Sequence, residues 1–523
     1  MKKFIALSIL GLLIMAFSAT AYAQPKLTFV ASGYLEVVSV ISKNLTPGTP
    51  AGFGGVSPGF IDTGNIATTW PTGYWPRAYG AAANAVYGRT SAYMEERARL
   101  NFSFIMDKSL SATVGFELDS GRWGSGNTYT GMGAWNTDTK EVEIMYAYIT
   151  AGLPYIGIPI PMTVRAGIQP LAVRPSIFLY TDGPAVTGTL NINPVLVGLT
   201  WAKAVEGRDA TSDDVDVYGL TASAKIGTIS VGGFAYYYNM NTYPLNQTST
   251  SYGVTPPNEA AMWWLGFNSD GKIGPVDYNF DFVYDFGNVR RRQNATPAIS
   301  PFAKRKVDYT GFATQLKVTF PWEKFAFGAL GMYASGADLN KTSRWGYPGD
   351  TVASNTGAFT SKVGSYLIPP GSEEWAIWGE AMVFNNNYIT GTALPPTMTP
   401  IGNYGAKMTR GAIGGTWVGK AFASVSPVPW YKVTLQGLYI GDTTKHGNTL
   451  NVCFKNGRIR DDKTIGWEFD LLNDIKIYNN LTWSVGGGIL FGGDALDIND
   501  GTARGHTSPS NPWIIATKLR YDF

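Results

Sequence analysis

The chain has 523 residues and a formal charge of +3, and only 15% of its residues are charged, against about 25% in a typical soluble domain. It contains 62 Gly, 29 Tyr, 26 Phe and 16 Trp, but one Cys and two His. The balanced charge argues against nucleic-acid binding, and the scarcity of Cys and His argues against a disulfide framework or a Cys/His metal site. We therefore expect no nucleic-acid partner, no metal and no cofactor.

The N-terminus has the pattern of a secretory signal peptide. Residues 1–3 are basic, residues 4–17 are apolar, and Ala-Tyr-Ala at 21–23 fits a cleavage site. We predict that residues 1–23 are removed on export and that residues 24–523 form one mature domain. Beyond this signal, no run of about 18 consecutive apolar residues occurs. The candidates are therefore a soluble exported domain or a membrane β-barrel.

From residue 27 onward, apolar and polar side chains alternate in one segment after another. In residues 110–119 every even-numbered side chain is apolar and every odd-numbered one is polar or glycine. Residues 276–286 alternate in the same way and set Asp277, Asp281 and Asp285 opposite an aromatic face. A period of two is typical of β-strands with one apolar face. The pattern predicts an all-β fold.

The connections between these segments alternate between short and long. Residues 107–109, 226–228 and 273–275 form short turns, whereas the stretches 42–92 and 336–410 are long and polar. This asymmetry is typical of a closed antiparallel transmembrane barrel with short periplasmic turns and long extracellular loops. A soluble sandwich has shorter strands and loops of similar length at both ends.

We predict about eighteen strands, with sixteen as the alternative, because both termini of such a barrel lie on the periplasmic side and the number is even. The segment Trp375 to Phe384 would make the number odd, so we place it within the outer loop as a hairpin arm or short helix. The predicted spans are 27–40, 93–106, 110–120, 140–150, 162–169, 185–192, 195–204, 214–226, 228–239, 261–273, 276–286, 307–320, 325–335, 411–424, 431–441, 464–475, 481–491 and 513–523.

The first and last spans must pair, because an unpaired backbone N–H or C=O in hydrocarbon costs several kcal/mol. Residues 515–523 alternate along the last span, and the chain ends at an aromatic residue, Phe523. That ending resembles the terminal strand by which the barrel-assembly machinery recognises bacterial outer-membrane proteins. We expect the protein in the outer membrane, in contact with its lipid and lipopolysaccharide.

Apolar side chains are expected to face lipid and hydrophilic ones a wet lumen. Across the turn at 107–109, this register sets Arg99 opposite Glu117 and Arg97 opposite Asp119 on the lumen side. Such charges would either create a transverse field across the lumen or only stabilise the wall as ion pairs. The predicted pore-lining residues are Arg97, Arg99, Glu117, Asp119, Glu141, Glu143, Arg165, Asp277, Asp281 and Asp285.

One connection is a candidate for a constriction. Residues 170–183 lie where general porins fold a loop into the barrel, although the connection is short here, and they include Arg174, Tyr180 and Asp182. The aromatic residues between Trp70 and Tyr79 in the first outer loop would either stack on sugar rings or pack within that loop.

Several strand patterns resemble one family. They are ERARLNFSFIMDKSLSATVGFELDSGRWG at 96–124, KEVEIMYAYI at 140–149, VRAGIQPLA at 164–172 and ATKLRYDF at 516–523. These segments resemble the outer-membrane homotrimeric porins of sulfate-reducing and related Gram-negative bacteria. The resemblance implies a trimer of water-filled channels that admit small hydrophilic solutes and ions by passive diffusion.

Three other functions are alternatives to a general porin. A substrate-specific outer-membrane channel would differ from a general porin only in details of its lumen, and a surface adhesin would have a filled lumen. An enzyme needs a positioned nucleophile and base, yet His446 and His506 both fall in predicted outer loops. We therefore expect no enzymatic activity.

Overall fold

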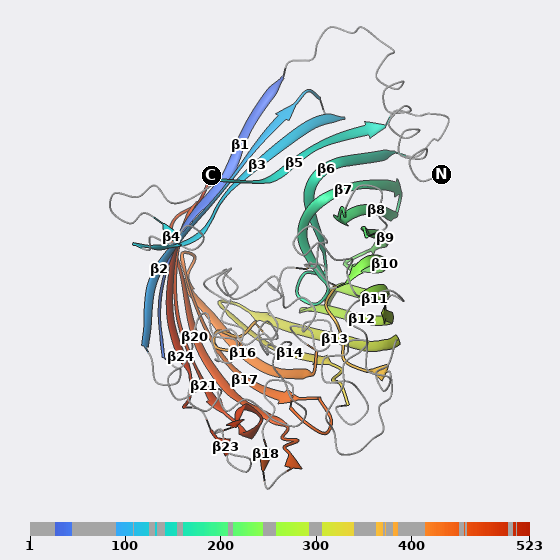
Figure 1. Cartoon of the computed structure of the whole chain (residues 1–523). Coiled ribbons are helices and arrows are strands. Elements are labelled where there is room, and N and C mark those ends of the chain that lie inside the picture. The colour runs from blue at the N-terminus through green and yellow to red at the C-terminus, as the bar shows by residue number, and fades with distance from the viewer. Residues whose placement is uncertain are drawn as a thin grey trace, which may run out of the picture.

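Antiparallel strands form one sheet that closes on itself (Figure 1). The sheet has 20 strands, of which β4 (Gly131–Met132) and β15 (Lys362–Val363) are two-residue additions that pair in parallel with β3 (Leu110–Trp123) and β13 (Lys306–Trp322). The others form an 18-strand antiparallel barrel, as predicted. The computed structural model describes residues 27–43, 90–107, 109–124, 131–132, 142–153, 161–207, 213–243, 258–291, 306–338, 362–369, 372, 380–384, 414–448, 454–455, 458–499, 506–508 and 510–523.

Each predicted span corresponds to one barrel strand, and the sixteen-strand alternative is wrong. Besides β3 and β13, the barrel strands are β1 (Thr28–Lys43), β2 (Thr90–Ile105), β5 (Glu143–Leu153), β6 (Met162–Val173), β7 (Leu179–Ile192), β8 (Val195–Val205), β9 (Val215–Ile226), β10 (Ile229–Tyr243), β11 (Asn258–Ile273), β12 (Val276–Arg291), β14 (Phe325–Ala334), β16 (Thr416–Val428), β17 (Tyr431–Asp442), β20 (Thr464–Tyr478), β21 (Leu481–Gly492) and β24 (Trp513–Asp522).

The first and last strands close the barrel. β1 pairs with β24 from Tyr34 opposite Asp522 to Lys43 opposite Trp513. Beyond this ladder, the Gly33 N–H donates to the carbonyl oxygen of Phe523 at 2.9 Å, and the Phe523 N–H donates to the Gly33 oxygen at 3.0 Å. The terminal aromatic residue therefore takes part in closure, and the predicted pairing of the end strands is confirmed.

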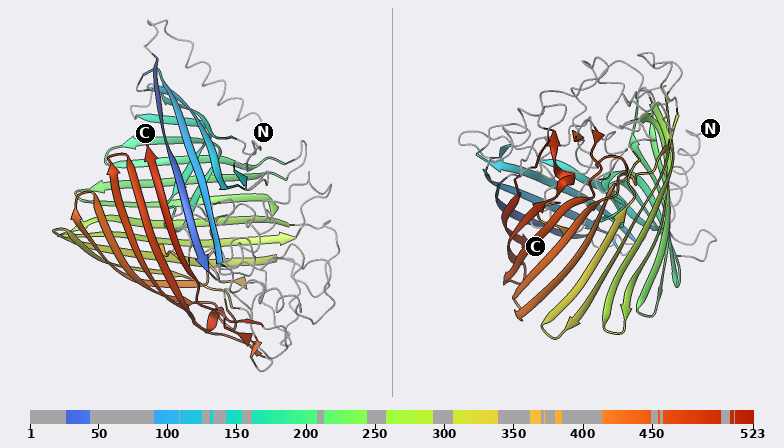
Figure 2. Two further views of the ribbon diagram at one scale, coloured as in Figure 1. Left: turned by 90° about the vertical axis from the view of Figure 1, so that its left-hand side faces the viewer. Right: turned by 90° about the horizontal axis from the view of Figure 1, so that it is seen from below.

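The two ends of the barrel differ, as the alternation of short and long connections predicted. Figure 2 shows tight turns along one end, and the strands that the long connections join end at the other. The β9–β10 and β11–β12 turns contain Gly227 and Gly274, with φ of 63° and 59°. A tight hairpin turn needs positive φ at its central positions, where glycine has no Cβ to clash.

The outer face of the barrel is apolar and exposed. Leu220, Phe267, Leu316 and Leu471 each expose between 41% and 51% of their surface, although they alternate with polar or buried neighbours. An exposed apolar band that runs around a closed sheet is stable only in contact with lipid or another apolar surface.

Aromatic side chains flank this band at both ends. At the long-loop end they contact one another across strands: the ring centroids of Tyr237 and Trp263 are 4.7 Å apart, and those of Tyr439 and Trp467 are 4.8 Å apart. Two such girdles are typical of barrels that span an outer membrane. At the short-turn end the exposed aromatic residues are Trp322, Trp430, Tyr478, Trp483, Tyr521 and Phe523.

The inner face has two zones, so the expectation of a uniformly hydrophilic interior is wrong. On β24, the inward residues are Lys518 and Arg520 near the short-turn end but Ile514 and Ala516 near the long-loop end, and the last two are buried. The same change occurs along β10, where Phe234 to Met240 supply buried inward side chains. The apolar zone is buried because segments of the chain fold into the barrel and cover it.

The register between β2 and β3 confirms one predicted pair and corrects another. Arg99 lies opposite Glu117, as predicted. Arg97 has no single partner on β3, because the register shifts between Glu96 and Ala98 and both Asp119 and Ser120 lie across from it. Such a β-bulge turns the neighbouring side chains relative to the ladder. Arg97 contacts Glu117 instead, with Nε 3.1 Å from the carboxylate oxygen.

Some predictions fall partly or wholly outside the described residues. These include the signal peptide, residues 70–79, Glu141 and residues 375–379. Of the segment predicted as a hairpin arm or short helix, residues 380–384 are described: Glu380 has a 3-10 conformation, residues 382–384 form bends, and residues 381–384 are buried. The described part of the chain has no helix with the length and apolar character that a bilayer span requires.

We predict that adjacent substitutions on β9 will have opposite consequences. Leu220 faces outward and Thr221 faces the lumen, so Leu220→Arg places a charge in lipid and should lower the free energy of unfolding by about 2–4 kcal/mol. Thr221→Arg should lower it much less. Urea unfolding in lipid vesicles measures both variants, and equal losses would contradict the assigned faces.

Candidate functional site

The hairpin formed by β6 and β7 bends into the barrel (Figure 1). Its strands pair in the wall with β5 and β8, but its tip, residues 174–178, contacts the inner face of β10 to β13. The predicted constriction candidates Arg174, Tyr180 and Asp182 all belong to this inward hairpin. The structure thus places the three candidates on one hairpin whose tip contacts the inner face of other strands.

A charged contact fixes the tip of the inward hairpin to the wall. Arg174 donates from both terminal nitrogens to Asp270 of β11, at 2.6 and 2.9 Å, and its Nε contacts Asp281 of β12. The Ser176 hydroxyl accepts a hydrogen bond at 3.0 Å from Gln315 of β13. Bidentate guanidinium–carboxylate contacts are strong and directional, so they hold the tip in one position.

One side of the inward hairpin is apolar and packs on the wall. The Phe178 ring stacks on Phe234 with centroids 4.4 Å apart, and it meets Tyr236 edge-on at 5.3 Å. Ile177 and Leu179 are also fully buried. This packing explains why the inner face of β10 and β11 is apolar at this level.

A segment of the connection between β14 and β16 lies over the same tip. We call residues 363–369 with Ser372 the strap. The Trp264 indole N–H donates to the Leu367 oxygen at 2.8 Å, and the Leu367 N–H donates to Asp285 at 3.3 Å. Tyr366 and Leu367 are fully buried. The strap is thus fixed to β11 and β12.

The same connection docks further around the wall. Glu380 contacts Lys317 of β13 and Lys420 of β16, both at 2.5 Å. Glu468 of β20 accepts hydrogen bonds from the N–H groups of Val383 and Phe384 at 2.7 and 2.8 Å. The hairpin tip, the strap and residues 380–384 therefore cover the inner wall from β10 to β20.

The opposite part of the wall carries a group of paired charges. Glu117 of β3 lies between two arginines of β2, 3.1 Å from Arg97 Nε and 3.0 Å from Arg99 Nε. Arg520 of β24 continues this arc, with its guanidinium 3.8 Å from the ring centre of Tyr34. We call this arc of β24, β1, β2 and β3 the charged arc.

The second side of the inward hairpin faces the charged arc. Asp182 forms a hydrogen bond with Tyr146 of β5 and interacts electrostatically with Arg99 and Glu117. Tyr180 likewise interacts with Arg99. The carboxylate of Asp182 on the hairpin thus lies within electrostatic range of the Arg99 guanidinium on the wall.

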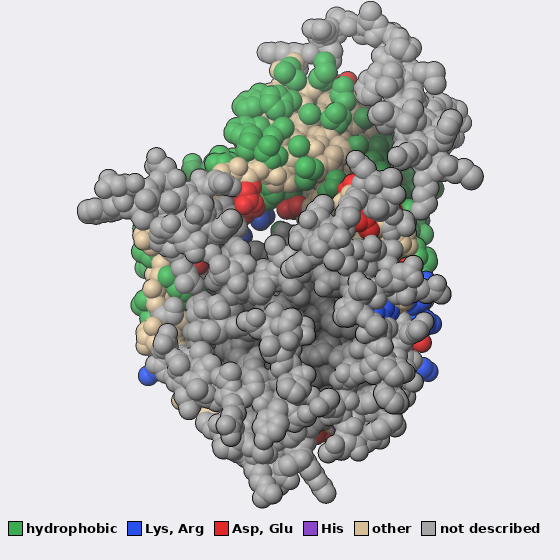
Figure 3. All heavy atoms as spheres, viewed as in Figure 1, with side chains coloured by type: hydrophobic (Ala, Val, Ile, Leu, Met, Phe, Trp, Pro, Cys, Tyr) green, Lys and Arg blue, Asp and Glu red, His purple; other side chains and the backbone are tan. Residues whose placement is uncertain are grey.

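Figure 3 shows a hollow with acidic and basic side chains at its rim. Hydrophobic side chains gather over the strands beyond it. The hollow coincides with the side of the barrel where β1, β3 and β5 lie in Figure 1. The uncovered passage is therefore off-centre.

The other predicted pore-lining residues lie on the inner face at different levels. Arg165 lies over the Tyr148 ring, 4.7 Å from its centre, and Asp277 pairs with Lys272 at 3.2 Å near the short-turn end. Glu143 is exposed opposite Glu117. Asp281 and Asp285 are also inward, but they are buried beneath the hairpin tip and the strap. The side chain of Asp119 and all of Glu141 lie outside the described residues.

The sequence reasoning missed several inward groups of the lumen. Glu36 and Arg520 face each other across β1 and β24, with a 3.3 Å contact, and Tyr34 lies beside them. The alternation in the end strands could have predicted this pair, because Glu36 and Arg520 both occupy inward-facing positions of their strands. Glu380 had no such signal, because no strand period places a loop residue against Lys317 and Lys420.

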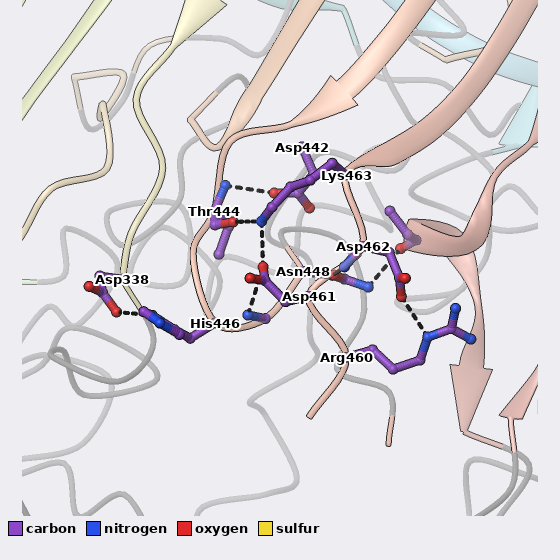
Figure 4. Close-up of polar contacts among 11 residues, drawn as sticks. Asp338, Asp442, Thr444, His446, Asn448, Arg460, Asp461, Asp462 and Lys463 are labelled. Carbon is purple, nitrogen blue, oxygen red and sulfur yellow. Dashed lines mark hydrogen bonds and ion pairs between the residues drawn. The ribbon is translucent and has the colours of Figure 1, made fainter. Parts of the chain in front are cut away.

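Polar contacts also join the bases of the outer loops (Figure 4). His446 Nδ1 lies 2.7 Å from Asp338, and Asp461 contacts Lys463 and the N–H of Gly447. Partial burial raises the pKa of Asp461, but Lys463 and the Gly447 N–H lower it further, so that it lies below its usual range. These contacts connect the bases of the outer loops to one another.

Comparisons with known proteins give similar folds at low identity. The chain is similar to OccK9 (OpdG) of Pseudomonas aeruginosa, with 9% identity, coverage of 95% of this chain and 98% of that one, and a TM-score of 0.48. OccK8 (OprE) of the same organism is 11% identical, with coverage of 95% of this chain and 98% of that one and a TM-score of 0.47. A BenF-like porin from Pseudomonas fluorescens is 8% identical, with coverage of 94% of this chain and 98% of that one and a TM-score of 0.46. No protein-family model and no curated protein matches the chain.

We predict a defined pH dependence for the contact of Glu380 with Lys317 and Lys420. Burial raises the pKa of Glu380, but the two ammonium groups lower it more, so that it lies below its ordinary value of 4.5. The contact therefore contributes stability at all pH values above 4.5, and the contribution is lost as pH falls through the lower folded-state pKa.

Glu380→Gln removes the charge at every pH and serves as the reference. The parent protein should unfold at a higher urea concentration than this variant by a constant margin from pH 8 to pH 5, and the margin should narrow below pH 4.5. A margin that widens on acidification would contradict the assignment.

Proposed function

We propose that the protein is an outer-membrane porin, a water-filled channel for the passive diffusion of small hydrophilic solutes and ions. The observation that carries this proposal is the charged arc. Chain segments cover the apolar inner wall from β10 to β20, whereas Arg97, Arg99 and Glu117 form ion pairs on the inner face of β2 and β3, where 8%, 15% and 10% of their side-chain surface stays exposed. Charged groups gain from contact with water, so a hydrated passage along this arc is the arrangement that the physical chemistry favours.

The membrane location is supported by the exposed apolar band, the two aromatic girdles and the terminal Phe523. Assembly through the last strand by the barrel-assembly machinery belongs to the same proposal. The proposal that this chain is a member of the porins of sulfate-reducing bacteria is supported by its strand patterns, of which the longest lies at residues 96–124.

A substrate-specific channel is the second candidate function. The covering segments restrict the passage to one side of the barrel, and a narrow passage favours contact with each solute. Measurements of current against solute concentration distinguish the two functions. A general porin gives ohmic currents, whereas a specific channel is saturated or blocked by one solute. We propose no enzymatic activity, since no nucleophile and base lie together at the described constriction.

We propose a homotrimer from the resemblance and from a gap in one aromatic girdle. At the long-loop end, exposed Trp and Tyr side chains occur on β8, β9, β11, β14 and β20, whereas in the described part of β1 to β7 only Trp123 is such a residue. The outward residues of β1 to β7 include the small side chains Ala31, Gly33, Ala98, Ala112, Ala147, Ala166 and Gly188. Close contact with other copies would cover this face.

The channel proposal predicts that Glu117→Gln shifts ion selectivity toward anions. The substitution leaves Arg97 and Arg99 without their shared carboxylate, and one unit charge at 4 to 8 Å in water amounts to about 0.5–1 kcal/mol. The cation-to-anion permeability ratio should fall roughly two- to fivefold. Reversal potentials across planar bilayers in a salt gradient measure it.

Asp277→Asn is the matched control, because it removes the same charge at the exposed short-turn end, where Asp277 pairs with Lys272. It should shift the reversal potential much less. Absence of ion current from the folded parent protein would overturn the channel proposal itself.

The trimer proposal predicts that Ala147→Trp on β5 yields monomers, because a bulky ring prevents close contact at this face. Ala222→Trp on β9, where the girdle is continuous, should remain trimeric. Chemical cross-linking in native membranes and sedimentation in detergent report the oligomeric state. A monomeric parent, or a trimeric Ala147→Trp protein, would contradict the proposed interface.

A further inference from the structure

The strap touches the inward hairpin at two places. The Tyr366 hydroxyl donates to the carbonyl oxygen of Ile177 at 2.6 Å, at the tip of the hairpin. The Ser372 hydroxyl accepts a hydrogen bond from the Tyr180 N–H at 3.0 Å and donates to the Phe178 oxygen at 3.2 Å. Two side chains of one connection therefore bind the backbone of another, nearly 190 residues apart in sequence.

These contacts occur where the backbone of the hairpin has left the wall. Residues 177–180 cross the lumen, so their N–H and C=O groups lose part of the ladder that a wall strand provides. A buried backbone group without a partner costs free energy comparable to a lost hydrogen bond. The hydroxyls of Tyr366 and Ser372 replace those missing partners.

The strap is itself well fixed, which makes it suitable as a support. The Tyr366 N–H donates to the Ser335 oxygen at 2.9 Å, next to the end of β14. Trp264 and Asp285 bind Leu367 from β11 and β12. The strap thus provides a second connection, besides the Arg174 contact, between the hairpin and the wall of β11 to β14.

We propose that the strap sets the position of the inward hairpin and, with it, the width of the passage, and that Tyr366 and Ser372 are positioning residues for the constriction. This inference rests on the proposed channel function. Neither residue faces the charged arc, since both are buried behind the hairpin. They act on permeating solutes only through the position of Tyr180 and Asp182.

The proposal predicts that Tyr366→Phe and Ser372→Ala each loosen the hairpin without unfolding the barrel. Amide hydrogen exchange over residues 174–182 should become about five- to tenfold faster, the effect of one lost hydrogen bond. Single-channel records should show greater open-channel current noise and added sub-levels. Folded mobility on an unheated gel checks that the barrel is intact in each variant.

Tyr238→Phe is the matched control. Tyr238 is also buried, and it packs against Trp264 with ring centroids 4.9 Å apart, but its hydroxyl has no hydrogen bond to the hairpin in the described structure. This variant should keep the exchange rate and the quiet current of the parent.

Hydrogen exchange separates failure of this inference from failure of the channel proposal. If the folded parent carries no current, the channel proposal is wrong and the inference about passage width falls with it, whatever the exchange rates are. If the parent conducts, and exchange and current noise are the same in the parent and in both folded strap variants, the strap does not position the hairpin. Faster exchange with unchanged currents would also overturn the inference, because the strap would then support the hairpin without setting the passage.

Discussion

The requirement that every backbone N–H and C=O find a partner in hydrocarbon governs this fold. It accounts for the closed ring, for the pairing of β1 with β24, and for the use of the last residue, Phe523, in hydrogen bonds to Gly33. Gly33 permits this close approach of strands, since a Cβ there would lie 2.0 Å from the carbonyl oxygen of Arg99 on the neighbouring strand. Closure in turn fixes which side chains meet lipid and which face inward.

Closure also creates an interior that the chain must fill or hydrate. The inward side chains at the long-loop end are apolar, including the fully buried Trp264 and Met262, and water would be a poor solvent for them. The hairpin tip, the strap and residues 380–384 cover that zone. Each covering segment combines apolar packing with a few charged or hydrogen-bonded anchors, such as Arg174 with Asp270. The covering segments therefore lie on the apolar zone of the inner face, and the charged arc lies on the other part of the wall.

The sequence predicted the barrel well because strand alternation is a local signal that lipid reinforces. A slip of one residue would move Arg99 and Glu117 from the lumen into lipid, so their register was readable from the turn at 107–109. Strand alternation does not predict whether other segments cover an inward residue, as Asp285 shows. Alternation placed it correctly on the inner face, but only the folded position of Leu367, more than 80 residues away, shows that it is buried beneath the strap rather than exposed to a pore. The β-bulge at Arg97 and Asp119 could not be predicted either, because apolar and polar residues alternate regularly in the residues of β3 that precede it.

The position of the passage connects the inner and outer faces of the barrel. The charged arc lies on β24 and β1 to β3, and the outer faces of β1 to β3 belong to the region where the long-loop aromatic girdle is interrupted. In the proposed trimer, the wall behind Arg97, Arg99 and Glu117 is backed by protein rather than by fluid lipid. Ion pairs retain a fixed geometry best where the backbone beneath them cannot move, because each additional conformation reduces their mutual attraction. The covering segments contact the opposite wall, and the inward hairpin is bound there both through Arg174 and through the strap.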